Sequence, residues 1–425
     1  MEAIKKNGSR DSARSNGNGK PGFGDFGLRP ELLRAVEALG FERPTPVQIE
    51  AIPPALEGRD ILGCAMTGSG KTAAFVLPIL QRLLDDPRRG TRALILTPTR
   101  ELAAQVAEHL AELAVHTSVR VATVFGGVAA GPQESALRKG VDVIVGTPGR
   151  LLDHFQHDYA KLSALEVLVF DEADRMLDMG FLPDIKRILR HLPKTPRQTL
   201  FFSATMPKEI VALSRDILRD PVRISVERKS APARGVVQAL YPVGPQLKVE
   251  LLGRLLERGE IGNAIVFCRT KHRADRVAKK LAARGITVGR IHGNRSQGQR
   301  TAALAAFKNG HTRVLVATDI VARGIDVEAL DHVVNFDVPH TPDDYIHRVG
   351  RTARAEMTGD AYTLVSPDEE ATIRAIERAL GRAIERRTVE GFDYQAPAES
   401  RLEAPGRERA RHRPARRTPA RLSPR

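Results

Sequence analysis

Short β-branched runs alternate with longer helical patterns along most of the chain, and this alternation constrains the fold more than any other feature. The runs are residues 93–96, 119–125, 141–145, 167–170 and 199–202 in the first half, and 264–268, 287–291, 313–317, 332–336 and 361–365 in the second. Strands separated by helices form βαβ units, which build a parallel sheet with helices on its faces. The alternation therefore predicts an α/β fold with two parallel sheets.

The length and one internal segment indicate how the chain divides. Its 425 residues exceed what one hydrophobic core usually holds, so two domains with tails are expected. Residues 227–235 are polar, contain a proline and lack periodicity, which is typical of a linker. We therefore predict one domain over residues 23–226 and a second over residues 236–390. The polar segment 1–22 and the Pro- and Arg-rich segment 391–425 are predicted to be disordered.

The net charge of +15 favours a polyanionic partner. Residues 1–22 carry +3 and residues 401–425 carry +7, whereas residues 23–400 carry only +5. We expect the C-terminal tail to contact nucleic acid electrostatically, although solubility alone would also explain such a tail. No apolar run reaches the ~18–20 residues that span a bilayer, and the N-terminus lacks the apolar core of a signal peptide. A cytoplasmic protein without a membrane partner is expected.

A glycine-rich turn follows the strand predicted at residues 60–65 and precedes an apolar helix. Residues 65–72 read AMTGSGKT, and backbone N–H groups of Thr67, Gly68, Ser69 and Gly70 could cradle phosphates. Lys71 would reach the terminal phosphates of ATP, and the Thr72 hydroxyl would bind Mg²⁺. Ala65 stands where the general phosphate-loop pattern has glycine, and the alternative is a plain turn.

Two carboxylates at a strand end complete the predicted nucleotide site. Asp171 and Glu172 follow the apolar run 167–170. Asp171 would hold Mg²⁺ through water, and Glu172 would orient or deprotonate the attacking water. Such an acidic group can also be a solvated helix start. The second half contains no Gly-Lys-Thr sequence, so one nucleotide is expected.

The two halves repeat an order of strand–Arg, strand–Gly and strand–Thr. The residues are Arg100, Gly127 and Thr147 in the first half, and Arg269, Gly293 and Thr318 in the second. All three residue types can contact phosphate, and ligands bind at the carboxyl ends of parallel strands. We infer one backbone-binding track across both domains, with coincidental loop chemistry as the alternative.

Residues 347–354, HRVGRTAR, supply a cluster of arginines. Their spacing of i, i+3 and i+6 is expected to place three guanidinium groups on one side, which suits a triphosphate. Arg351 and Arg354 would act as fingers on the γ-phosphate once the two domains meet. A basic surface face is the alternative.

The order of these motifs resembles the DEAD-box ATP-dependent RNA helicases over roughly residues 23–390. The matching segments are Phe23 with 40–48, then 65–72, 98–103, 126–127, 147–150, 171–174, 203–205, 266–270, 317–326 and 347–354. The resemblance implies two tandem RecA-like domains that close on ATP and RNA together.

The resemblance also implies roles for individual residues. Gln48 would read adenine with Phe23 or Phe41 stacked nearby, and Asp326 would contact the ribose. The residues expected to couple the nucleotide to the RNA site are Asp174, Ser203, Thr205, His347 and Arg348. The residues expected to hold RNA phosphates and 2′-hydroxyls are Arg100, Gly127, Thr147, Gly149, Arg150, Arg269, Gly293, Thr318 and Asp319.

The activity expected from this resemblance is local, non-processive unwinding of RNA with little sequence preference. The segments 292–297 and 197–206 look most like the bacterial RhlE-type branch, which suggests partners in ribosome assembly or RNA decay. Asn294 stands where Asp is common, and Ala353 where Gly is usual. Two alternatives remain at this stage, a superfamily 2 DNA helicase or translocase and an ATP-gated RNA clamp that does not turn over.

Overall fold

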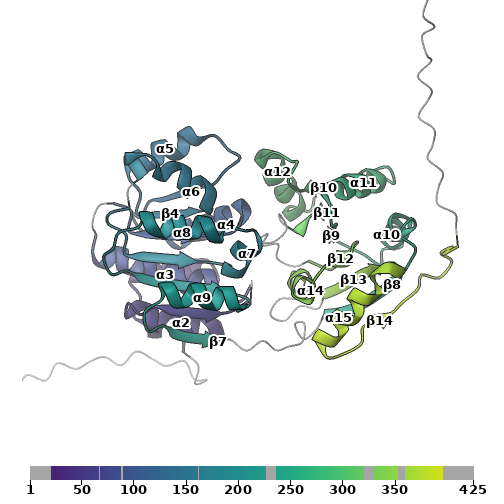
Figure 1. The fold of residues 1–425 in the computed structure, drawn as a ribbon, viewed down its shortest axis with the longest axis horizontal. Helices are drawn as coiled ribbons and strands as arrows, with labels where there is room; N and C mark the ends of the chain where they lie inside the picture. Colours follow the sequence, from purple (N-terminus) through teal and green to yellow (C-terminus); the bar gives the residue numbers. More distant parts are fainter. Residues whose placement is uncertain are drawn as a thin grey trace, which may run out of the picture.

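Two parallel β-sheets, each of seven strands, organise the chain (Figure 1). The computed structural model describes residues 21–66, 68–87, 90–160, 162–225, 236–319, 330–352 and 359–395. The first sheet contains β1 (Ile61–Cys64), β2 (Ala93–Leu96), β3 (Val121–Val124), β4 (Val143–Gly146), β5 (Val167–Phe170), β6 (Gln198–Ser203) and β7 (Val222–Ser225). The second contains β8 (Val236–Pro242), β9 (Ala264–Phe267), β10 (Val288–Ile291), β11 (Val314–Ala317), β12 (His332–Asn335), β13 (Gly359–Val365) and β14 (Glu385–Arg386). The predicted fold class is confirmed.

Both sheets have the same strand order. It runs β3-β4-β2-β5-β6-β1-β7 in the first sheet and β10-β11-β9-β12-β13-β8-β14 in the second. When each set is numbered from its own first strand, the two orders are identical. The repeat seen in the sequence is therefore a repeat of topology, and equivalent strand ends occupy equivalent places.

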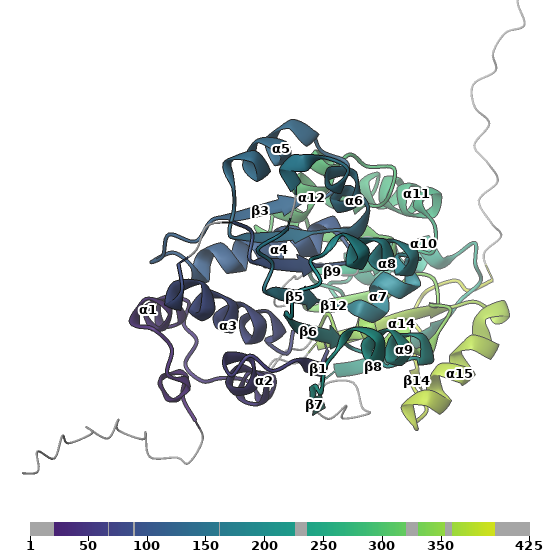
Figure 2. The same ribbon diagram turned by 60° about the vertical axis from the view of Figure 1, so that its left-hand side comes forward.

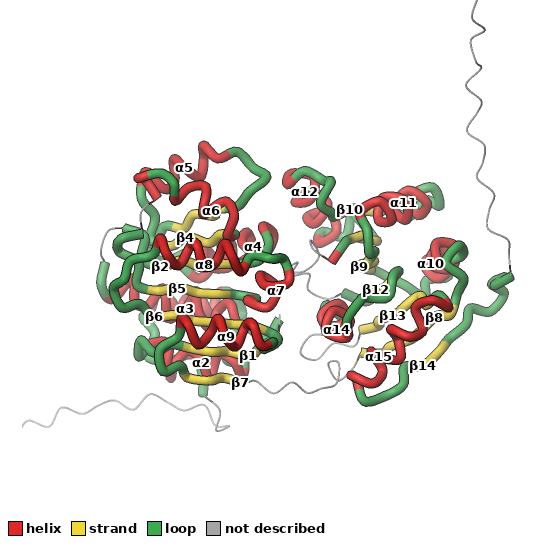
Figure 3. The backbone as a smooth tube through the Cα atoms, in the orientation of Figure 1, coloured by secondary structure: helices red, strands yellow, loops and turns green. Residues whose placement is uncertain are grey.

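Helices cover both faces of each sheet (Figures 1 and 3). In the first half these are η1 (Phe23–Phe26), α1 (Pro30–Ala38), α2 (Pro46–Leu56), α3 (Lys71–Asp85), α4 (Arg100–Leu113), α5 (Ala130–Lys139), α6 (Pro148–Phe155), η2 (Asp158–Ala160), α7 (Ala173–Asp178), α8 (Leu182–His191) and α9 (Lys208–Ile217). In the second half they are α10 (Lys248–Glu257), α11 (Lys271–Ala282), α12 (Gln297–Lys308), α14 (Pro342–Val349), η3 (Pro367–Glu369) and α15 (Glu370–Leu380).

The apolar core of each half lies between the sheet and these helices. Helices α1–α4 pack on one face of the first sheet, and α6–α9 pack on the other. Helices α10 and α11 cover one face of the second sheet, and α12, α14 and α15 cover the other. Every residue of β2, β4, β5, β9, β11 and β12 is buried, as expected for central strands covered on both sides.

Three strands were not among those predicted from the sequence. Two of the four residues of β7 are exposed, and β14 has only two residues. Strand β8 directly follows the segment predicted to be a linker. Short or partly exposed strands carry little periodic signal, so only their pairing with β1 or β8 identifies β7 and β14.

At the C-terminal end, the structure describes five residues beyond residue 390, and two of them pack on the domain. Phe392 and Tyr394 pack on the core of the second half, and the Val389 N–H donates to the Tyr394 hydroxyl at 2.8 Å. The predicted tail therefore contains an ordered start, because two aromatic rings have apolar surface to bury. Its remainder, residues 396–425, and residues 1–20 and 226–235 lie outside the described residues. No helix in the described part of the chain is long and apolar enough to cross a bilayer.

Candidate functional site

The glycine-rich turn lies between β1 and α3, as its sequence predicts. Gly70 is the residue before the first helical residue, Lys71, and has a φ of 91°. Gly68 also has positive φ, and the Ser69 hydroxyl donates to the Met66 carbonyl at 2.7 Å. Backbone N–H groups at the start of a helix form a ready anion site. Thr67 lies outside the described residues.

Lys71 lies beside the carboxylates that follow β5. Its ammonium is 3.4 Å from Asp171 Oδ1, and both side chains are about 5% exposed or less. Burial by itself would lower the pKa of Lys71, but Asp171, Glu172 and Asp174 outweigh it and raise that pKa. Burial, with repulsion from Glu172, also raises the pKa of Asp171. Both shifts follow from a buried cluster in which three carboxylates surround one ammonium.

This surplus of negative charge fits a divalent cation. Apart from their mutual ion pair, Lys71 Nζ and Asp171 Oδ1 have no hydrogen-bond partner in the described part of the chain. Thr72, the second helical residue of α3, follows Lys71 directly. A carboxylate and a hydroxyl are oxygen ligands of the kind that Mg²⁺ prefers, with phosphate and water completing its octahedron.

Glu172 has an unusual backbone conformation. Its φ of 55° and ψ of 52° place it in the left-handed region, as the residue that precedes α7. For a residue other than glycine this conformation costs about 1 kcal/mol or more. The conformation turns the chain sharply after β5 and keeps Glu172 buried beside Asp171.

Gln48 joins the predicted adenine-recognition segment to the glycine-rich turn. Its side-chain oxygen accepts from the Thr45 N–H at 2.8 Å, and its nitrogen donates to the Gly70 carbonyl at 3.1 Å. A Cβ at Gly70 would lie 2.6 Å from Gln48 Nε2, so this position requires glycine for space as well as for its φ. The Gln48 side chain is therefore hydrogen-bonded directly to the backbone of the glycine-rich turn.

The aromatic residues predicted to lie near adenine form a small cluster. Phe23 is buried and stacks on Phe41 with ring centroids 6.2 Å apart, and Phe26 meets Phe23 edge-on. Phe41 is the more exposed ring of the pair.

Asp174 is hydrogen-bonded to the segment after β6. Its Oδ2 accepts from both the N–H and the hydroxyl of Thr205, each at 2.8 Å. The Asp174 N–H donates to Ser203 Oγ at 3.2 Å, and that hydroxyl donates to the Thr205 carbonyl at 2.6 Å. The structure thus brings together three of the five residues predicted to couple the two sites.

The first half of the predicted RNA track lies at adjacent strand ends. The Arg100 guanidinium lies over Gly126 and Gly127, and a Cβ at Gly127 would fall 1.7 Å from Arg100 Nη1. Thr147 follows β4, and its N–H donates to the Val124 carbonyl of β3 at 3.0 Å. Gly149 and Arg150 lie in the first turn of α6, and Arg150 donates to the Val128 carbonyl at 3.3 Å.

The second half repeats this arrangement. The Thr318 N–H donates to the Ile291 carbonyl at 3.2 Å, which matches the Thr147 contact strand for strand. Arg269 follows β9 and is held by Glu369 at 2.9 Å, with its side chain 38% exposed. Gly293 follows β10, and a Cβ there would meet nothing within 4 Å. The order read in the sequence therefore corresponds to equivalent positions in space.

Among residues 347–354, Arg348 is held by groups of its own domain. Arg348 does not face a triphosphate, because its guanidinium binds both Asp319 oxygens at 2.7 Å and also Asn335 and the Asp337 carbonyl. Arg348 was also expected to couple the nucleotide to the RNA site, and its contact with Asp319 of the predicted RNA-binding set is compatible with that role. The same contacts occupy Asp319, which was expected to hold RNA.

The rest of this segment lies at the boundary between the two halves. His347 lines a cavity of about 600 Å³ together with Asp174 and Thr205 of the first half. Arg351 is buried, and a Cβ at its neighbour Gly350 would lie 3.6 Å from the Met66 methyl of the glycine-rich turn. Arg354, Ala353 and Asp326 lie outside the described residues.

Two polar contacts that join the halves were not predicted. The helices that they connect, α4 with α12 and α7 with α14, lie near each other in Figure 2. Glu101, in the first turn of α4, accepts from Arg300 at 2.6 Å and from Gln297 at 2.9 Å, both on α12. Arg175, directly after Asp174, pairs with Asp344 of α14 at 3.2 Å. The only signal for either contact was that Glu101 and Arg175 each follow a predicted site residue.

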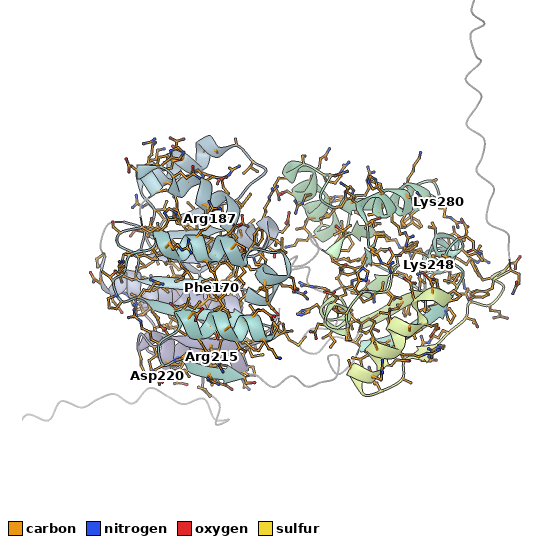
Figure 4. All side chains as sticks on the ribbon, in the orientation of Figure 1. Phe170, Arg187, Arg215, Asp220, Lys248 and Lys280 are labelled. Atoms are coloured by element: carbon orange, nitrogen blue, oxygen red, sulfur yellow. The ribbon has the colours of Figure 1, made fainter. Side chains whose placement is uncertain are left out.

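Lys248 is the counterpart of Lys71 in the repeated topology. Each is the first residue of the helix after the first strand of its sheet. The Lys248 ammonium, labelled in Figure 4, binds Glu369 at 2.5 Å and the carbonyls of Phe336 and Leu364. Its charge is thus neutralised inside the domain, so Lys248 differs from Lys71 in its partners as well as in its position.

Comparisons with known proteins agree with this geometry. The family described as DEAD/DEAH box helicase matches residues 45–213, and the helicase conserved C-terminal domain matches residues 247–356. Proteins named DEAD-box ATP-dependent RNA helicase CshA are 43% identical in Bacillus cereus, over 89% of this chain and 72% of theirs, and 42% identical in Bacillus subtilis, over 86% and 73%. The relatives named here are CshA proteins, so the expected RhlE-type branch is not shown.

Solved structures give the same result. Dbp5 of S. cerevisiae bound to RNA and ADP BeF3 is 31% identical, with a TM-score of 0.79 over 86% of this chain and 95% of that one. Mss116 bound to ssRNA and UDP-BeF is 27% identical, with the same TM-score over 87% and 80%. The chain belongs to the DEAD-box ATP-dependent RNA helicases and is an ATP hydrolase.

Proposed function

We propose that this chain couples the hydrolysis of one ATP, bound with Mg²⁺, to local unwinding of short RNA duplexes. The observation that carries the proposal is the buried cluster of Lys71, Asp171 and Glu172, which lies at a phosphate-binding turn beside the second domain. Hydrolysis requires a cation at the phosphates, a base near the attacking water and charge stabilisation on the γ-phosphate.

The residues divide these tasks as follows. Lys71 binds the β- and γ-phosphates, and Glu172 orients the attacking water. Thr72 and Asp171 would hold Mg²⁺, which neutralises the charge that develops on the phosphates when it is bound. Arg351, together with Arg354, stabilises the γ-phosphate from the second domain. Hydrolysis then depends on contact between the two domains.

RNA binds along the repeated strand ends. Arg100, Arg150 and Arg269 bind phosphates, and the protein backbone around Gly127 and Gly293 lies close to the RNA backbone. Such contacts carry little sequence information, and 2′-hydroxyl contacts favour RNA over DNA. ATP and RNA each contact both domains, so each ligand strengthens binding of the other.

We place this helicase in the bacterial cytoplasm, acting with protein partners in ribosome assembly or RNA decay, on the resemblance of residues 292–297 and 197–206 to the RhlE-type branch. Recovery of ribosomal precursors or decay enzymes with the full chain would separate the two settings.

The test is steady-state ATPase activity with structured RNA, with DNA of the same sequence and with neither. We expect strong stimulation by RNA, little by DNA, and a loss of about a hundredfold or more in kcat for Glu172→Gln. Equal stimulation by DNA would contradict the RNA preference. Full activity of Glu172→Gln would remove the assigned role of that carboxylate.

A further inference from the structure

Helix α11 begins where the RNA track of the second domain ends. Thr270 caps its N-terminus, directly after Arg269 of the track. From there the helix runs outward over β10 and β11, and Figure 4 labels Lys280 near its far end. Helix α11 therefore extends away from the predicted track along one face of the second sheet.

The charge of the folded part is concentrated on α11. The helix contains three Lys, two Arg and one Asp, so its net charge is +4, against +5 for all of residues 23–400. The rest of the folded part is therefore close to neutral, and α11 is a local basic patch in it.

The basic side chains point to solvent while the apolar ones pack on the sheet. Ala274, Val277, Ala278 and Leu281 are buried. The exposed residues are Lys271, His272, Arg273, Arg276, Lys279 and Lys280.

The one carboxylate of the helix is directed elsewhere. Asp275 binds Arg290 at 3.0 Å and His292 at 3.1 Å, both on the segment through β10. Among the described residues, no carboxylate pairs with Arg276 or Lys279. Their charge is therefore available to a polyanion.

A direct contact connects this helix to the track. Lys271 Nζ donates to Asn294 Oδ1 at 2.9 Å, and Asn294 follows Gly293 of the track. Asparagine at this position carries no charge, so it leaves the charge of Lys271 uncompensated, whereas an aspartate would neutralise it. Lys271 thus joins the track to α11, whereas Arg273 on the same helix pairs with the buried carboxylate of Asp337.

We propose that the exposed basic face of α11 is a second RNA contact, which holds the phosphodiester backbone of RNA that continues beyond the strand-end track. The helix is about 18 Å long, which matches about five phosphates of one strand in a duplex. Lysine and arginine on a helix face read charge and not bases, so this contact adds affinity without sequence preference. It rests on the proposed function, since it extends the RNA path of that site.

The test compares two triple variants of the full chain. One is Arg276→Gln, Lys279→Gln, Lys280→Gln on α11. The matched control is Arg374→Gln, Arg378→Gln, Arg382→Gln, which removes the same charge from exposed positions on and just after α15, over the other face of the same sheet. RNA affinity is measured by fluorescence anisotropy at several salt concentrations, with strands of about 6 and about 20 nucleotides.

The α11 variant is expected to lose about tenfold affinity for the long strand at low salt, and its log–log salt slope should fall by about 2. Binding of the short strand and ATPase activity stimulated by it should not change, and the control should resemble wild type. If both variants lost the same RNA affinity, the effect would come from the overall positive charge of the protein and not from α11. If the α11 variant bound the long strand as wild type does, the proposed contact would be contradicted. If the short strand fails to stimulate wild-type ATPase, the proposed function fails, whatever α11 does.

Discussion

Two glycines control how closely charged and polar side chains approach the backbone of the site. Gly70 leaves room for the Gln48 amide and Gly127 for the Arg100 guanidinium, and both have positive φ. A side chain at Gly70 would clash with the Gln48 amide, and one at Gly127 with the Arg100 guanidinium. The effect of either substitution should therefore appear in ligand binding more than in stability.

Gly127→Ala tests this at the RNA track. The added methyl would displace the Arg100 guanidinium and strain a φ of 77°, so we expect RNA affinity to fall about tenfold, equivalent to one lost charge-assisted contact. The KM for ATP should stay unchanged. Gly131→Ala is the control, because a Cβ there meets nothing within 4 Å. Equal effects of the two substitutions on RNA affinity would contradict the assigned position of Arg100.

At the scale of elements, a buried charge network fixes α10, α11 and η3 together. Glu369 Oε2 accepts from Lys248 at the start of α10, and Oε1 accepts from Arg269, two residues before α11. One carboxylate thus neutralises Lys248, the counterpart of Lys71, and orients Arg269, which is predicted to bind RNA. We regard Glu369 as a positioning residue.

Glu369→Gln should lower the free energy of unfolding of the second domain by about 3 kcal/mol at neutral pH, because it leaves the Lys248 ammonium buried without a counter-charge. Burial would raise the pKa of Glu369, but the hydrogen bond and charge of Lys248 hold it below its ordinary value of 4.5. The carboxylate therefore stabilises the fold above pH 4.5, and this stabilisation is lost as the pH falls through the lower native pKa.

Urea unfolding followed across that pH range measures both effects. The difference between wild type and Glu369→Gln should shrink below pH 4.5. The exposed neighbour Asp368→Asn is the control and should leave the urea midpoint at neutral pH almost unchanged. A constant difference at all pH values would mean that the carboxylate charge is not what stabilises the domain.

At the scale of the whole molecule, the contacts of Glu101 with Arg300 and of Arg175 with Asp344 hold the two domains together. The first lies beside the RNA track, next to Arg100. The second lies beside Asp174, which is hydrogen-bonded to the segment after β6. Contacts that exist only when the domains meet contribute to the coupling between ATP and RNA.

Asp344→Asn should weaken that coupling with little effect on either ligand alone. We expect the gain in RNA affinity caused by a non-hydrolysable ATP analogue to fall about fivefold, or about 1 kcal/mol. RNA binding is measured with and without the analogue. Asp343→Asn removes the same charge from an exposed position in the same turn of α14 and should leave the gain unchanged. A loss of RNA affinity without nucleotide would instead indicate damage to the domain itself.

The sequence by itself determined the strands that carry the site and the residues that follow them. Alternating runs and helices predicted two parallel sheets, because period and length are local properties of the chain. The phosphate-binding turn and the repeated Arg, Gly and Thr positions were likewise predictable, since parallel strands place their carboxyl ends on one edge.

Only the tertiary structure decided which of these residues are free to bind a ligand. Arg348 is occupied within its own domain by Asp319, 29 residues away in the sequence. Glu101 and Arg300 are 199 residues apart, and Arg175 and Asp344 are 169 apart. Pairing over such separations depends on how the two domains are oriented. The charge pattern of one segment therefore does not predict which distant residue will pair with it.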